Sequence, residues 1–99
     1  MLDLTPHHLT EVRRILLLHV PGRRVCAFGS RVQGNAKPFS DLDLVVMGEV
    51  PLDFRQLAVL KDAFTESNLP FRVDVIDWAS TSDTFRRIIE GAFEVVAGE

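Results

Sequence analysis

The chain has 99 residues, of which 46% are hydrophobic and 25% are charged, and its formal net charge is −3. These values are typical of one globular domain, and they argue against a disordered chain and against a second, substrate-binding domain. The sequence has no basic run to neutralise nucleic acid, no apolar run near the roughly 18 residues of a membrane span, and no signal-peptide pattern. We therefore expect a single domain over residues 1–99, in the cytoplasm, that binds neither nucleic acid nor membrane.

The first predicted element is a helix that begins after Thr5 and ends before Pro21-Gly22. Threonine can cap the free N–H groups of a helix, and the proline that follows it fits the first turn. Residues at helical spacing then form one stripe: Leu9, Val12, Ile15, Leu16 and His19. His7 and His8 are adjacent, a spacing that does not place both rings on one metal ion, so we expect them to face solvent.

Residues 24–28 predict a buried strand that runs directly into Gly29-Ser30. Cys26 is the only cysteine, so we expect a small core side chain and no disulfide. Glycine allows the backbone to approach a ligand closely, and a helix that starts at Ser30 would leave N–H groups free for an anion. We expect Gly29 and Ser30 to bind the phosphates of a ligand.

Two cations lie beside this turn, and the sequence leaves two interpretations of them open. Arg31 and Lys37 could each contact phosphate, and Arg31 is the candidate for that role. Each could instead be a solvated loop charge, which is the ordinary environment of such a residue.

Asp41-Leu42-Asp43 precedes the apolar run 44–47, which predicts a second strand. Side chains two residues apart project from the same face of a strand, so the carboxylates of Asp41 and Asp43 lie close together. Two such anions need a cation between them. Mg²⁺ prefers oxygen ligands and keeps positions for water and substrate phosphates, so the pair predicts a magnesium site opposite Gly29-Ser30.

The rest of the chain predicts a helix, a strand and a final helix. Asp53 with Gln56 resembles a capping box, and the following apolar stripe predicts a helix over roughly 54–67. Residues 71–77 predict a third strand, made parallel to the second by the helix that connects them. A last amphipathic helix is predicted from the spacing of Phe85, Ile88, Ile89 and Phe93. This alternation predicts an α/β (α+β) fold with a small mixed sheet of three to four strands and helices packed on it.

Asp74 interrupts the third strand, and parallel pairing would bring it beside Asp41 and Asp43. A lone carboxylate among apolar residues is costly without a partner. Asp74 could be an edge-facing or hydrogen-bonded carboxylate, but beside the acidic pair and the Gly-Ser turn we interpret it as a functional residue. Asp77 is three residues further on, points to the opposite face and belongs to the strand end or the following loop. Trp78 could pack on the core or line a nucleotide pocket, and we favour packing.

At these residues the chain resembles the nucleotidyltransferase superfamily typified by DNA polymerase beta, and within it the minimal nucleotidyltransferase (MNT) family. The matching segments are residues 29–34 for Gly-Ser-x-x-x-Gly, residues 40–44 for Ser-Asp-x-Asp-Leu, and residues 73–78 for the third-strand signature. The resemblance implies a polymerase beta-like nucleotidyltransferase fold and transfer of a nucleoside monophosphate, with ATP as the donor. It also implies two Mg²⁺ ions held by Asp41, Asp43 and Asp74, with the last orienting the acceptor hydroxyl.

The resemblance implies a partner as well. MNT proteins act as antitoxins of HEPN-domain toxins, and some add AMP to a tyrosine of the toxin. This chain contains no tyrosine, so the acceptor tyrosine would belong to the partner. Two alternatives stay open: a non-catalytic antitoxin that acts by binding, and a small-molecule nucleotidyltransferase of the aminoglycoside-modifying type, against which the short chain counts.

Overall fold

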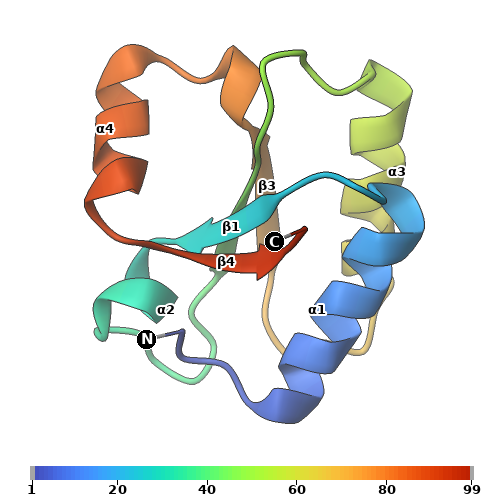
Figure 1. The fold of residues 1–99 in the computed structure, drawn as a ribbon. Coiled ribbons are helices and arrows are strands. Elements are labelled where there is room, and N and C mark those ends of the chain that lie inside the picture. Colours follow the sequence, from blue (N-terminus) through green and yellow to red (C-terminus); the bar gives the residue numbers. More distant parts are fainter. Residues whose placement is uncertain (1, 99) are drawn as a thin grey trace.

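The computed structural model describes residues 2–98, which form a four-stranded sheet with helices packed against it (Figure 1). The elements in chain order are α1 (Pro6–His19), β1 (Val25–Phe28), α2 (Ser30–Gln33), β2 (Leu42–Val46), α3 (Phe54–Thr65), β3 (Val73–Asp77), the short 3-10 helix η1 (Trp78–Ser80), α4 (Asp83–Gly91) and β4 (Phe93–Ala97). The predicted mixed α/β architecture is confirmed. No helix among residues 2–98 has both the length and the apolar character needed to span a membrane.

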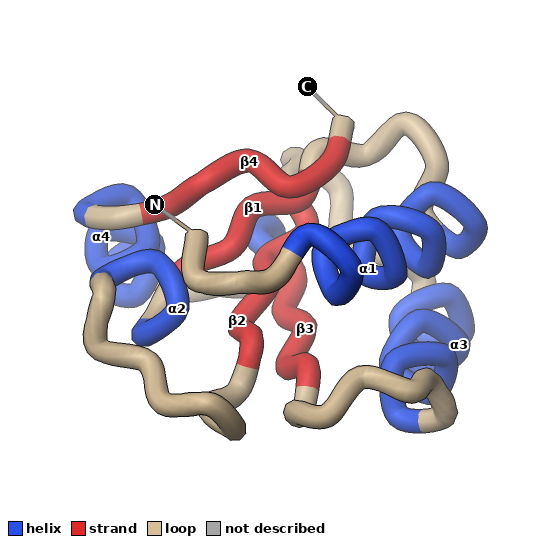
Figure 2. Tube along the Cα trace, turned by 90° about the horizontal axis from the view of Figure 1, so that it is seen from below, coloured by secondary structure: helices blue, strands red, loops and turns tan. Residues whose placement is uncertain are grey.

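The strands lie in the order β3-β2-β1-β4. β1 pairs antiparallel with β2 and with β4, whereas β2 and β3 are parallel. The predicted crossover is therefore confirmed, with α3 as the helix that carries the chain from β2 back to the start of β3. Figure 2 shows α1 and α3 on one side of the strands and α4 on the other.

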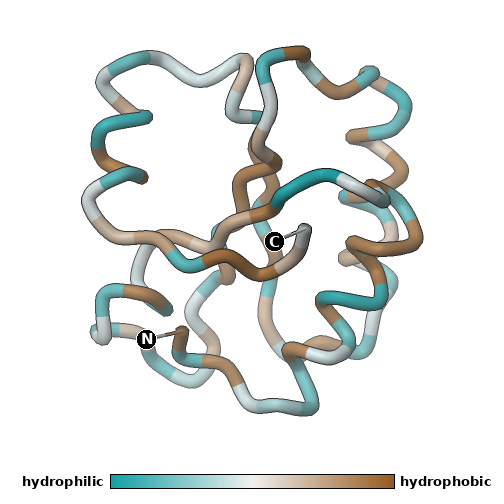
Figure 3. Tube along the Cα trace, viewed as in Figure 1, coloured by the Kyte–Doolittle hydropathy of each residue, from teal (hydrophilic) through white to brown (hydrophobic). Residues whose placement is uncertain are grey.

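Each face of the sheet has its own apolar cluster, because successive strand side chains alternate between faces. The larger cluster packs under α1 and α3 and includes Val12, Leu16, Val25, Ala27, Leu44, Val46, Leu60 and Phe64. The smaller cluster packs under α4 and consists of Cys26, Phe28, Val45 and Ile89, with partly buried Trp78 and Phe85 against it. In Figure 3 the central strands are largely coloured as hydrophobic. Asp43 is two residues from Val45, so its side chain belongs to the α4 face.

The capping residues of the helices are only partly those that the sequence predicts. Thr5 caps α1 by accepting a hydrogen bond from the His8 N–H at 3.2 Å, and Asp53 caps α3 by accepting from the Arg55 N–H at 2.7 Å. The capping-box role of Gln56 is wrong, because its amide donates to the His19 carbonyl at 3.2 Å and so ties α3 to the end of α1.

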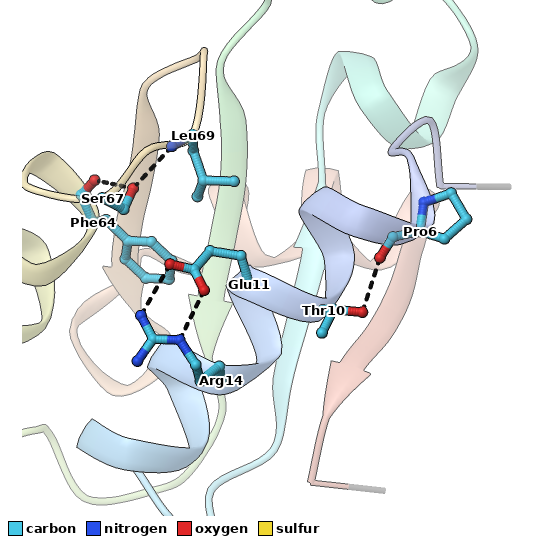
Figure 4. Close-up of polar contacts among 7 residues, drawn as sticks. All are labelled: Pro6, Thr10, Glu11, Arg14, Phe64, Ser67 and Leu69. Atoms are coloured by element: carbon cyan, nitrogen blue, oxygen red, sulfur yellow. Dashed lines mark hydrogen bonds and ion pairs between the residues drawn. The ribbon is translucent and has the colours of Figure 1, made fainter.

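Figure 4 shows polar contacts at the end of α3 and along α1. α3 ends at Thr65, two residues before the predicted end, because the Ser67 hydroxyl donates to the Phe64 carbonyl at 2.7 Å and accepts from the Leu69 N–H at 3.3 Å. Glu11 and Arg14 form an ion pair at 2.7 Å on the outer face of α1. Such an exposed pair is worth only about 0.5 kcal/mol, so the buried stripe stabilises α1 far more.

Two further predictions need correction. Phe93 begins β4 and does not belong to the last helix, which ends at Gly91. The residues of β4 pair with β1, so the sheet contact overrides a spacing that also fits a helix. His7 is exposed as expected, but His8 is partly buried and its ring meets Phe71 edge-on at a centroid distance of 5.5 Å.

Candidate functional site

Two of the predicted carboxylates are direct neighbours in the sheet. Asp43 on β2 and Asp74 on β3 are register partners in the parallel pair. Neighbouring strands lie about 4.8 Å apart, and register partners share a face, so these side chains stand side by side. Asp41 comes just before β2 and has the same face parity as Asp43. The structure thus gathers the three aspartates at one end of the sheet.

The surroundings of Asp43 disfavour its negative charge. Burial is the largest cause of a raised pKa of the Asp43 carboxyl. The negative charges of Asp74 and Asp41 raise this pKa further, and the guanidinium of Arg72 lowers it in part. A carboxylate that is held in such a place without a cation is electrostatically frustrated, which favours binding of positive charge.

The raised pKa of Asp43 predicts that the difference in stability between the wild type and Asp43→Asn depends on pH. A carboxyl group whose folded pKa exceeds its ordinary value of 3.8 favours folding while protonated, and this contribution is lost as the pH rises through the folded pKa. We therefore expect the unfolding free energy of the wild type to fall relative to Asp43→Asn as the pH rises above 3.8, and the difference then to level off. Urea unfolding of both proteins between about pH 3.5 and 7 in EDTA measures it. Parallel curves at all pH values would contradict the electrostatic description of this carboxyl.

Gly29 brings the backbone against the same carboxylate. β1 ends at Phe28, which is the register partner of Asp43, and Gly29 follows with φ 81° and ψ −157° before α2 begins at Ser30. A Cβ atom at position 29 would collide with the Asp43 carboxylate oxygen, and it would lie 3.3 Å from the carboxyl carbon. Only glycine combines this backbone conformation with such a close approach. The predicted Gly-Ser turn therefore lies next to the predicted acidic pair.

Arg31 is buried, and its guanidinium is fully engaged with the backbone of other segments. Its side chain donates to the carbonyl oxygens of Asp3, Pro38 and Ser40 at 2.9, 3.1 and 3.0 Å. The guanidinium carbon also lies 4.3 Å from the centre of the Phe71 ring. The expectation of a solvated loop charge is wrong for Arg31, which is 5% exposed, although Lys37 is exposed as expected.

Arg31 thus fixes the loop that leads into Asp41. Three backbone carbonyls would lose a charged donor if this side chain were removed. A contact of Arg31 with phosphate stays a prediction, and it would require the guanidinium to leave these hydrogen bonds.

Arg72 is the site residue that the sequence analysis missed. Its Nε and Nη2 atoms donate to one carboxylate oxygen of Asp41 at 3.2 and 2.8 Å. Leu42 and Val73 are register partners, and Asp41 and Arg72 each stand one residue before them. The parallel register could have indicated this contact, because it places the residue before β2 beside the residue before β3.

The donor set fits a hard divalent cation once Asp41 turns away from Arg72. Within residues 2–98 no three carboxylate, imidazole or thiol groups converge as the side chains stand. Asp43 and Asp74 are adjacent, and Asp41, whose side chain is 40% exposed, would join them by a change of side-chain rotamer that breaks its two hydrogen bonds to Arg72. Carboxylate oxygens at a solvent-accessible strand end are ligands that Mg²⁺ accepts together with water and phosphate oxygens.

Two other predicted residues have structural roles. Asp77 ends β3 and is 6% exposed, and its carboxylate accepts from the N–H groups of Leu52 at 2.7 Å and Ala79 at 3.4 Å. Trp78 packs against the smaller apolar cluster, with the Arg86 guanidinium 4.9 Å from the ring centre. Packing, the interpretation favoured for Trp78, is confirmed.

Comparisons with known proteins identify similar sequences and a similar fold. The chain is 52% identical over 95 residues to a probable protein adenylyltransferase MntA of Haemophilus influenzae, covering 96% of this chain and 83% of that protein. It is similar to a crystal structure of a toxin–antitoxin with AMP-PNP, with a TM-score of 0.76, 24% identity and coverage of 92% of this chain and 73% of that one. It is also similar to a chain in a solved structure of a tri-AMPylated Shewanella oneidensis HEPN toxin in complex with MNT antitoxin, with a TM-score of 0.70, 20% identity and coverage of 94% of this chain and 71% of that one.

The solved structures share little sequence with this chain, so their similarity establishes a common fold. A family model described as a nucleotidyltransferase domain matches residues 9–96, which include Gly29-Ser30 and all three aspartates. Together with the 52% identity to the Haemophilus protein, this match shows that the chain belongs to the nucleotidyltransferase domain family.

Proposed function

We propose that this chain transfers AMP from ATP to a hydroxyl group of a partner HEPN-domain toxin and thereby acts as an antitoxin. The observation that carries the proposal is the register pairing of Asp43 with Asp74 beside a glycine whose backbone lies against Asp43. The names of the similar proteins support it, since one is a probable protein adenylyltransferase and another is an MNT antitoxin bound to a tri-AMPylated HEPN toxin. The acceptor tyrosine would belong to the partner, because this chain has none. The proposed reaction would take place in the cytoplasm.

The aspartates would hold two Mg²⁺ ions, with Asp41 and Asp43 binding both and Asp74 binding one. Divalent cations at such a site lower the pKa of the attacking hydroxyl and neutralise the leaving pyrophosphate. The exposed carboxylate of Asp74 would orient the acceptor hydroxyl and accept its proton. The backbone at Gly29 and the hydroxyl of Ser30 would bind the β- and γ-phosphates, which aims the α-phosphate at the acceptor.

The proposed step balances as a nucleotidyl transfer. The acceptor oxygen forms a bond to the α-phosphorus of ATP, and the bond from that phosphorus to the bridging oxygen of pyrophosphate breaks. The acceptor proton passes to Asp74 or to water. Most of the catalytic effect comes from positioning and from stabilisation of charge on the phosphate oxygens.

Arg72 competes with the metal ions for Asp41, which gives a binding prediction. We expect Arg72→Gln to tighten Mn²⁺ binding by up to about fivefold at low ionic strength, because an exposed ion pair is worth only about 0.2 to 1 kcal/mol. Titration calorimetry, or the loss of the free Mn²⁺ signal in electron paramagnetic resonance, measures this change. Arg55→Gln is the control, since Arg55 is exposed at the start of α3, away from the aspartates. Weaker Mn²⁺ binding by Arg72→Gln would mean that Arg72 positions Asp41 for the metal.

The proposal is tested by incubating the chain with its partner HEPN protein, Mg²⁺ and ATP labelled at the α-phosphate. We expect label on the partner with the wild type and none with Asp41→Asn. If the partner stays unlabelled but its toxicity is still neutralised, and Asp41→Asn neutralises equally well, the protein is an antitoxin that acts by contact. Labelling of an aminoglycoside by the isolated chain would instead favour the small-molecule alternative.

A further inference from the structure

We propose that Phe39 is a docking residue for the protein segment that carries the acceptor hydroxyl, a statement that rests on the proposed function. Phe39 is 75% exposed and stands two residues before Asp41. Two residues of extended chain reach at most about 7 Å, so the Cα atoms of these residues cannot lie further apart. A large apolar side chain is thus presented to solvent at the rim of the metal-binding carboxylates.

The turn that carries Phe39 is held in place on both sides. Arg31 donates to the carbonyl before Phe39, at Pro38, and to the carbonyl after the next peptide bond, at Ser40. The Ser40 hydroxyl accepts from the Lys37 N–H at 2.8 Å, and the Ser40 N–H donates to the Lys37 carbonyl at 3.0 Å. The Arg31 side chain is buried, so its own two hydrogen bonds to this turn are partly shielded from water. An exposed aromatic ring on an ordered turn loses little conformational entropy on binding, which is how aromatic contact residues gain affinity.

A protein segment suits this position better than the adenine base. A cleft of about 400 Å³ lies beside the turn and is lined by Lys37, Pro38 and Phe71, but Phe39 does not line it. Small ligands occupy concave sites, whereas aromatic side chains, including phenylalanine, are enriched in protein–protein contacts. The acceptor hydroxyl must approach Asp74 closely to react, so the segment that bears it passes the rim of the aspartates. Phe39 is the exposed aromatic residue nearest in the chain to that rim.

The test compares Phe39→Ala with Phe54→Ala in the full chain. Phe54 is 86% exposed at the start of α3, beyond the end of β2 opposite to Asp43, so it is a matched exposed phenylalanine away from the site. Calorimetry gives the Kd for the partner HEPN protein and for AMP-PNP with Mg²⁺, and thermal unfolding checks the fold. We expect Phe39→Ala to weaken partner binding about 10- to 30-fold, as for an interface hot spot, with AMP-PNP affinity within about twofold of the wild type. Phe54→Ala should leave both unchanged.

Each other result overturns the proposal. Unchanged partner affinity in Phe39→Ala would remove the docking role, and weaker AMP-PNP binding with unchanged partner binding would assign the ring to the base. Loss of self-association in sedimentation, with partner binding intact, would assign it to a second copy of the chain. The proposed function fails separately: if the wild type binds the partner but never labels it, the transfer reaction is wrong while the effect of Phe39→Ala on binding still decides the docking role.

Discussion

Replacing Asp43 by asparagine is expected to lower the rate of the proposed AMP transfer by at least about a thousandfold while the protein stays folded. Asp43 is the central carboxylate of the three. Asp74 on β3 is its register partner, and the backbone of Gly29 lies against the carboxylate oxygen of Asp43. An amide of the same shape keeps the packing but removes the charge that would hold a divalent cation. The rate is measured with labelled ATP and partner protein at saturating Mg²⁺.

The same substitution is expected to leave thermal stability at neutral pH equal to or above that of the wild type. Burial and two neighbouring carboxylates raise the pKa of Asp43, so its charged form opposes folding when no metal is bound. Asp62→Asn, on the exposed side of α3, is the control and should change neither the rate nor the stability. A fully active Asp43→Asn protein would rule out this carboxylate as a metal ligand.

Replacing Gly29 by alanine is expected to abolish transfer and to destabilise the fold by about 2 to 3 kcal/mol. Two causes act together. The new Cβ would collide with the Asp43 carboxylate, and the φ of 81° with ψ of −157° is a conformation that alanine rarely adopts. Urea unfolding and the transfer assay measure the two effects.

Gly34→Ala separates the two causes. Gly34 also has a positive φ, of 87°, but a Cβ at that position meets no atom within 4 Å. We expect it to cost about 1 kcal/mol of stability and to leave most of the activity. If Gly29→Ala were as active as Gly34→Ala in the transfer assay, the close approach of position 29 to Asp43 would not contribute to activity.

The positions of the three aspartates could be predicted because each depends on a local signal. Alternation along β2 gives the face shared by Asp41 and Asp43, and a helix between two strands makes them parallel, which brings Asp74 alongside. Gly29-Ser30 follows from the end of an apolar strand. These inferences require only the order of elements and the period of a strand.

The contacts of the two arginines could not be predicted, because they depend on how distant segments meet. Arg31 binds carbonyls of Asp3, Pro38 and Ser40, which lie 28, 7 and 9 residues away in the chain. Arg72 reaches Asp41 across 31 residues: the register of β2 and β3 sets the two residues side by side, but no local pattern specifies how their side chains turn. The prediction of Phe93 in a helix is wrong for a related reason. Its spacing from Ile89 fits a helix, but its pairing with β1 makes it part of a strand.

The engagement of Arg31 also changes the interpretation of the Gly-Ser segment. Arg31, the residue after Ser30, fixes the loop before Asp41. The short segment 29–31 therefore contacts both Asp43 and the loop that leads into Asp41. Gly29 lies against Asp43 while Arg31 orders the backbone around Ser40. The proposed phosphate and metal sites would therefore be linked through the loop 35–40, and this link would require no contact of Arg31 with phosphate.

Intact-mass spectrometry of the partner HEPN protein tests the central claim most directly. The partner is incubated with this chain, ATP and Mg²⁺, beside a parallel reaction with the Asp41→Asn/Asp43→Asn variant. We expect the partner to gain about 329 Da, or a multiple of it, only with the wild type and only when the metal is present. An unmodified partner in a stable complex with the wild-type chain would contradict AMP transfer and leave an antitoxin that acts by binding.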